Sequence, residues 1–140
     1  MKKIIPIIIL SLLSIILMPG CRRVSHNGKI DGYWQIREIY YTATGEIQNP
    51  KNKFICINLE LMQLNYPNPS PELTGVLAYH KGDDAIGVDF RYGPSAELLA
   101  QFGFAPTPDN PNFCTLDIKR VDSKNLVLES PIATITCKKF

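Results

Sequence analysis

Apolar side chains recur at every second position through most of the chain after Gly32. The clearest case is residues 54–61, where every second side chain is isoleucine or leucine. A period of two places successive side chains on opposite faces of a β-strand, so each strand has one buried face and one wet face. This pattern is typical of antiparallel sheets. The segments predicted as strands are 33–42, 54–61, 73–80, 86–92, 112–121, 126–128 and 133–140.

One segment, 94–102, has the pattern of a short helix instead. Pro94 suits the first helical position, and Gly103 is a natural stop. Leu98, Leu99 and Phe102 fall on one face of this helix. The proline-rich stretch that follows, 105–111, is predicted to be a loop. A second proline-rich stretch, 67–71, is predicted to break the chain between two strands.

Consecutive strands joined by short turns predict an all-β fold, a small antiparallel up-and-down barrel of about seven or eight strands with one inserted helix. The alternative is a β-sandwich. An immunoglobulin-like sandwich has its tryptophan between paired cysteines, whereas Trp34 precedes the three cysteines of the folded part. The residues expected to face the barrel interior are Trp34, Ile36, Leu77, Tyr79, Val88, Phe90, Leu116 and Ile118.

The N-terminus has the pattern of an export signal. Lys2 and Lys3 precede an apolar run over 4–18, and Gly20 precedes Cys21. The run is shorter than the roughly 20 apolar residues that a membrane-spanning helix needs, so a cleaved signal is the favoured interpretation.

The end of this run resembles the lipobox of bacterial lipoproteins, in which the cysteine after the cut site is acylated. The resemblance implies that Cys21 carries the acyl chains that hold the chain on a membrane. Met18 and Pro19 depart from the usual lipobox, which has leucine and a small residue at these positions. An ordinary signal peptide followed by an unmodified Cys21 is the alternative.

These features divide the chain into three parts: a signal peptide over 1–20, a lipidated N-terminus and polar tether over 21–31, and one barrel domain over 32–140. Arg22 differs from the aspartate that keeps lipoproteins in the inner membrane. The resemblance therefore implies the cell envelope of a Gram-negative bacterium, with the anchor in the outer membrane and the domain on the periplasmic side.

Charge and motifs exclude several function classes. The chain has 15 basic and 13 acidic residues, and Lys2 and Lys3 leave with the signal, so the mature chain is formally neutral. Nucleic-acid binding, which needs a basic surface, is not expected. The sequence holds no nucleophile, zinc or phosphate-loop motif, and its only histidines are His26 and His80. We therefore expect no enzyme activity, no cofactor and no metal.

Three cysteines remain after Cys21, and an odd number cannot pair completely within one chain. Cys114 and Cys137 fall on apolar strand faces with the 126–129 strand between them. Two strand spacings exceed the distance that a disulfide spans. We therefore expect buried thiols rather than a disulfide, while Cys56 falls on a polar face.

The first predicted strand opens with Gly32-Tyr33-Trp34, which resembles the Gly-x-Trp motif of lipocalins. In that family the tryptophan closes one end of the barrel and packs on a basic residue of the last strand. The resemblance implies that a lysine near the chain end, Lys138 or Lys139, contacts Trp34.

Taken with the export signal, the helix near residues 98–103 and the Lys-Lys-Phe end, the chain resembles small bacterial lipoproteins with a lipocalin-like domain of unknown function. The resemblance covers residues 32–140 and implies a fold rather than an activity.

Two functions fit these expectations. The first is a barrel that binds a small apolar ligand in a cavity of at least about 300 Å³, lined by the eight interior residues. The second is a non-catalytic module whose filled barrel presents an outer surface to a protein partner. In the second case Tyr40–Tyr41 and Phe102–Phe104 are the predicted exposed aromatic pairs.

Overall fold

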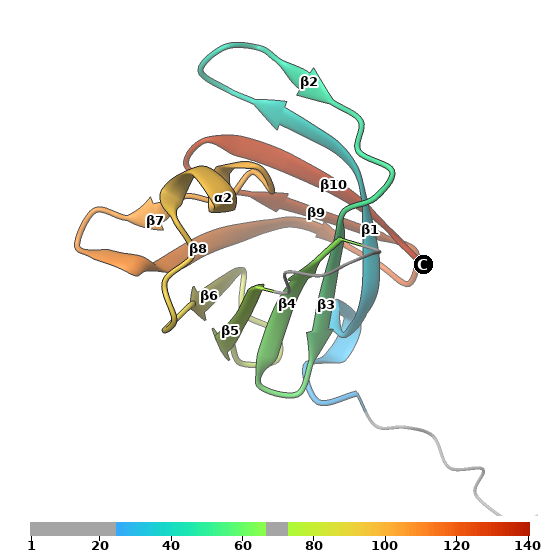
Figure 1. Ribbon diagram of the computed structural model, residues 1–140. Helices are drawn as coiled ribbons and strands as arrows, with labels where there is room; N and C mark the ends of the chain where they lie inside the picture. Colours follow the sequence, from blue (N-terminus) through green and yellow to red (C-terminus); the bar gives the residue numbers. More distant parts are fainter. Residues whose placement is uncertain (1–24, 67–72) are drawn as a thin grey trace, which may run out of the picture.

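A computed structural model describes residues 25–66 and 73–140, and Figure 1 shows these residues as a strongly curved sheet that closes on itself. Eight strands form the closed ring. They are β1 (Gly32–Tyr41), β3 (Phe54–Asn58), β4 (Leu61–Asn65), β5 (Leu73–Ala78), β6 (Ala85–Asp89), β8 (Asn110–Val121), β9 (Asn125–Glu129) and β10 (Ala133–Lys139).

Each strand of the ring is antiparallel to both of its neighbours, and neighbours in the ring follow one another along the chain. The ring closes where β10 pairs with β1, in a register that places Trp34 opposite Lys139. The prediction of an antiparallel up-and-down barrel is therefore confirmed. The alternative of a β-sandwich is wrong, because a sandwich has no such closing pair.

Four shorter elements decorate the ring. A 3-10 helix, η1 (Gly28–Ile30), precedes β1, and α2 (Ala96–Ala100) lies between β6 and β8. The two-residue strands β2 (Ile47–Gln48) and β7 (Pro106–Thr107) extend β1 and β8 beyond the ring, as Figure 1 shows.

The segment predicted as one strand over 54–61 is in fact a hairpin. β3 ends at Asn58, Leu59 and Glu60 form the turn, and β4 returns with Leu61 opposite Asn58. Leu59 adopts φ 54°, a left-handed conformation that turns favour at glycine or asparagine and rarely at leucine. The alternation of apolar side chains continues through the turn, so the sequence pattern gives no sign that the chain reverses direction there.

The predicted helix is shorter than 94–102. Ser95, rather than Pro94, precedes the first turn, and its hydroxyl accepts a hydrogen bond from the Leu98 backbone N–H. The predicted loop over 105–111 contains β7 and the start of β8, because β8 extends two residues further toward its N-terminus than its alternation indicated. The predicted break at 67–71 lies outside the described residues.

The fold begins before Gly32. Asn27 and Ile30, which were assigned to a polar tether, are buried against the barrel. Ile30 is the one apolar side chain within residues 25–31 and belongs to the core cluster. The structured part of the predicted tether therefore forms one end of the domain, whereas Cys21 and the predicted signal lie outside the described residues.

The cysteine prediction is confirmed for the two core thiols. Cys114 and Cys137 are buried and form no disulfide, and β9 separates their strands. Burial raises the pKa of the Cys114 thiol to about 11 and also raises the pKa of Cys137. Both side chains act as small apolar groups of the core. Cys56 is partly buried.

The inside of the ring is packed by its own side chains. A methyl group added at Gly75 would collide with Cγ1 of Val88 and would lie 3.0 Å from the ring of Phe90. Such close approaches leave no space for another carbon. Because residue 75 of β5 is a glycine, Val88 of β6 and Phe90 just after β6 can fill the interior.

Gly75→Ala is expected to lower the free energy of unfolding by about 1–3 kcal/mol, because the new methyl group overpacks the interior. Urea unfolding of the purified domain measures this change. Thr74→Ala, at the exposed neighbouring position, is the matched control and should cost less. Adding Val88→Ala to Gly75→Ala should relieve the crowding, so the double variant should lose less stability than the two single changes together. Simple additivity would show that the interior has room.

Candidate functional site

The eight residues predicted to face the interior do so to different extents. Trp34, Ile36, Val88, Phe90 and Leu116 are 0–1 % exposed, so water reaches almost none of their surface from inside or outside. Leu77 is at the margin of burial. Tyr79 and Ile118 are only partly buried, and they lie on the wall of a groove at one end of the barrel. Six of the eight residues proposed as cavity lining thus belong to a packed core, and Tyr79 and Ile118 pack against it from the side of the groove.

At the end where β1 begins, Lys139 lies across the face of Trp34. The Lys139 Nζ is 4.3 Å from the centre of the indole ring and also donates a hydrogen bond to the Asp31 carbonyl oxygen. A cation held over a tryptophan face is attracted by the negative charge of the ring. Burial lowers the pKa of Lys139, and the nearby Asp31 carboxylate opposes that shift.

The Gly-x-Trp motif owes its glycine to this contact. Gly32 has φ +146°, and a Cβ there would collide with the Lys139 Nζ. Any other residue would block the lysine that crosses to Trp34. The expected contact between Trp34 and a lysine of the last strand is present, and Lys139 makes it.

Residues 27–31 close this end of the barrel. The Trp34 Nε1 donates to the Ile30 carbonyl oxygen at 2.8 Å. The buried Asn27 side chain donates to Asp31 at 2.6 Å and to the Leu59 carbonyl oxygen at 2.7 Å. These bonds fasten the N-terminal segment to β1 and to the β3–β4 turn, and they satisfy the buried amide of Asn27.

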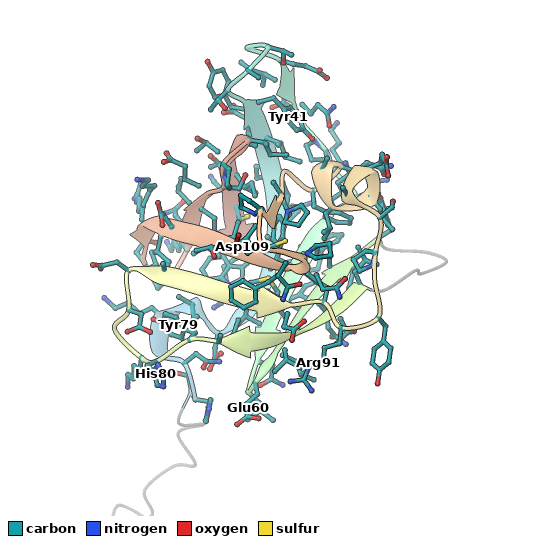
Figure 2. All side chains as sticks on the ribbon, turned by 90° about the vertical axis from the view of Figure 1, so that its left-hand side faces the viewer. Tyr41, Glu60, Tyr79, His80, Arg91 and Asp109 are labelled. Carbon is teal, nitrogen blue, oxygen red and sulfur yellow. The ribbon has the colours of Figure 1, made fainter. Side chains whose placement is uncertain are left out.

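Two open grooves flank this N-terminal segment. The larger, of about 950 Å³, lies between the segment and the turns β5–β6 and β8–β9. Its apolar wall contains Tyr79, Ile118 and Val121. The smaller, of about 810 Å³, lies on the side of β3, with Tyr33 and Leu59 in its wall. In Figure 2, Tyr79, His80 and Glu60 lie at the end of the molecule where the described residues begin, and Tyr41 lies at the opposite end.

Basic side chains predominate around the larger groove. It is bordered by three carboxylates, Asp31, Asp83 and Asp84. The five basic residues that border it are Lys29, Lys81, Lys119, Arg120 and Lys139.

The charged turn at His80 is exposed to solvent. The Asp83 carboxylate accepts a hydrogen bond from the His80 backbone N–H at 2.8 Å and lies 3.5 Å from its ring nitrogen. The side chain of His80 is 96 % exposed, so this is a solvated turn. Within residues 25–66 and 73–140, no cluster of three or more histidine, cysteine or acidic side chains has the spacing for a metal ion.

The second end of the barrel is closed by the segment from α2 to residue 104. Tyr41 donates to the Ala100 carbonyl oxygen at 2.7 Å, and the Lys53 ammonium donates to the carbonyl oxygen of Gln101. The Ser130 hydroxyl donates to the carbonyl oxygen of Gly103 at 2.5 Å. Burial raises the pKa of Tyr41 and lowers that of Lys53, because both polar groups lie partly under this segment.

The prediction that Phe102 and Phe104 form an exposed pair is wrong. Both are fully buried, because they follow α2 into the barrel, where Phe104 lies 6.3 Å from the ring of Phe90. Only one member of the predicted Tyr40–Tyr41 pair is exposed. Tyr40 is exposed, whereas Tyr41 is partly buried and donates a hydrogen bond to α2. Ile47 of β2 is exposed directly opposite Tyr40.

Sequence reasoning missed Asn27, Ile30 and Lys81 as parts of the site. The isoleucine within a polar run was the available signal for Ile30. For Asn27 the signal was its spacing of four from Asp31, which is weak on its own. Lys81 borders the groove because its side chain lies against Gly28, a contact between distant parts of the chain that no local pattern encodes.

Comparison with known proteins gives one family and two structures. The lipocalin-like domain family matches residues 15–140. A lipocalin-like protein from Bacteroides uniformis has a TM-score of 0.63 at 15% sequence identity, over 81% of this chain and 100% of that chain. An uncharacterized protein from Bacteroides eggerthii has a TM-score of 0.60 at 20% identity, over 79% of this chain and 98% of that chain. No curated protein matches the sequence significantly. These structural similarities concern the fold.

Lys139→Met is expected to lower the free energy of unfolding by about 0.5–2 kcal/mol, because it removes the charge over Trp34 while keeping most of the side-chain length. Lys138→Met is the matched control, since Lys138 is the exposed neighbour on the same strand. Chemical unfolding of both variants measures the difference. Equal losses in the two variants would mean that the lysine–tryptophan contact contributes nothing specific.

Proposed function

Since the chain belongs to the family of lipocalin-like domains, we propose that it is a lipid-anchored, non-catalytic module of the cell envelope that binds through its outer surface. The observation that supports this proposal is the packed interior. A carrier of apolar ligands needs a cavity, and pockets for small molecules have volumes of about 300 Å³ or more. Here the side chains at the barrel axis occupy that space.

Packing makes an interior ligand energetically unfavourable. Both ends of the ring are covered, one by residues 27–31 and the other by the segment after α2. A ligand of ordinary size would have to displace core side chains such as Phe90 and Phe104, and the loss of their contacts would cost several kcal/mol. The alternative function, a small apolar ligand inside the barrel, requires that rearrangement.

The anchor in this proposal is Cys21. Its place directly after the apolar run and Gly20 supports acylation, and two or more acyl chains hold a protein stably on a bilayer. Within residues 25–66 and 73–140 the chain has no helix that is long and apolar enough to cross a membrane. Arg22 after the cysteine supports the outer membrane, with the domain on the periplasmic side.

The proposed contact for a protein partner is the extension of the ring formed by β1 and β2. Tyr40 and Ile47 lie opposite each other there, and both are exposed. Ile47 is 55 % exposed, on a strand of two residues that continues beyond the barrel. An exposed aromatic and an exposed aliphatic side chain on neighbouring strands are the kind of surface that a protein partner covers.

Native mass spectrometry of residues 22–140, exported so that the chain folds in a bacterial periplasm, tests this function. The expected result is a mass equal to that of the bare chain, because the interior is already filled. A reproducible mass excess that disappears on denaturation would contradict the proposal and support the ligand-carrying alternative. Repeating the measurement with Gly75→Ala provides a control, since overpacking should reduce any interior occupancy further.

A further inference from the structure

Chain length limits how far the proposed anchor can lie from one end of the barrel. Three residues, 22–24, separate Cys21 from Ser25, so the fully extended chain spans about 14 Å at most between the two Cα atoms. Ser25 borders both grooves beside the N-terminal segment. If acyl chains on Cys21 enter a bilayer, this end of the barrel lies within that short distance of the lipid headgroups.

The same end carries basic side chains suited to anionic headgroups. Lys29 and Lys81 border the larger groove and are exposed. Neither forms an ion pair with any of the described side chains, whereas Lys119 is paired with Glu129 at 3.3 Å and Arg120 with Asp122 at 3.0 Å. Unpaired lysines near an anionic bilayer are attracted to it.

Exposed apolar side chains lie at this end as well. Phe140 is 74 % exposed, and its backbone N–H donates to the carbonyl oxygen of Tyr33 at the start of β1. Leu59, in the β3–β4 turn that Asn27 holds, is 59 % exposed. Phenylalanine and leucine beside lysine form the combination that lies in the interface between lipid tails and water.

We propose that this end of the barrel, formed by residues 25–31, Lys81, Leu59 and Phe140, docks on the bilayer and binds the phosphates of anionic lipid headgroups through Lys29 and Lys81. The inference rests on the proposed acylation of Cys21. It deepens the proposed function, because docking this end directs the opposite end, with Tyr40 and Ile47, away from the membrane toward partners.

The test uses the acylated chain, purified from a Gram-negative host and placed in nanodiscs of equal parts phosphatidylglycerol and phosphatidylcholine. A few lipids carry a nitroxide on the headgroup, and backbone NMR signals report which residues approach it. We expect signal loss concentrated at residues 25–31, 59–60, 80–84 and 140 and little loss at 41–48. The double variant Lys29→Glu and Lys81→Glu should require roughly tenfold or more anionic lipid for the same loss. The control, Arg37→Glu and Lys51→Glu, makes the same charge change outside both grooves.

The mass of the purified chain shows whether Cys21 is acylated, so a failure of the anchor can be told apart from a failure of docking. If Cys21 carries acyl chains but signal loss is uniform, or greatest at 41–48, docking of this end is overturned while the anchor stands. If both double variants lose the pattern equally, headgroup recognition by Lys29 and Lys81 is overturned. If the chain carries no acyl group, the proposed anchor itself fails, and docking that depends on it fails with it.

Discussion

The β-sheet closes at the seam where β1 and β10 pair, from Trp34 opposite Lys139 to Tyr41 opposite Ala133, and one side-chain contact joins the two strands at the end where β1 begins. Lys139 from β10 crosses over Gly32 and places its charge on the face of Trp34 in β1. The indole in turn holds the carbonyl oxygen of Ile30, so the N-terminal segment covers the same end. The cation–π contact and the indole hydrogen bond thus join the beginning of the described chain to its end. The glycine allows this because it leaves space for the lysine.

Closure leaves an interior that this chain fills with its own side chains. A ring of eight strands leaves an interior that side chains can fill, or that holds one small ligand when they do not. In this chain Trp34 closes one end, Phe102 and Phe104 enter from the other, and Phe90 lies between them against Gly75. The two ends of the barrel differ on its outer surface: one carries grooves bordered by Lys29 and Lys81, which form no ion pair with the described side chains, and the other carries the extended β1–β2 pair.

The sequence predicted the fold class because alternation of period two survives in every strand that has one wet face. It also predicted the buried thiols and the lysine on Trp34. It failed where a local pattern was ambiguous: Leu59 turns the chain in a conformation that leucine rarely adopts, so a hairpin was taken for one strand. It failed too where tertiary contacts decide burial, as for Asn27, Ile30 and Phe104, because a segment that closes the end of a barrel has no periodic signature. The grooves lie between turns that come together only when the barrel closes. No single segment of the sequence therefore predicts them.

The central claim is that the barrel is closed and filled around Trp34, which is the only tryptophan of the chain. Acrylamide quenching of its fluorescence measures directly whether water and small solutes reach the interior. A filled barrel predicts emission that is shifted to shorter wavelength than in the unfolded chain and that is quenched only weakly, because no part of the indole is exposed. Quenching of the folded protein as efficient as that of the urea-unfolded protein would contradict this claim, since a solute would then reach the interior that the structure shows as packed.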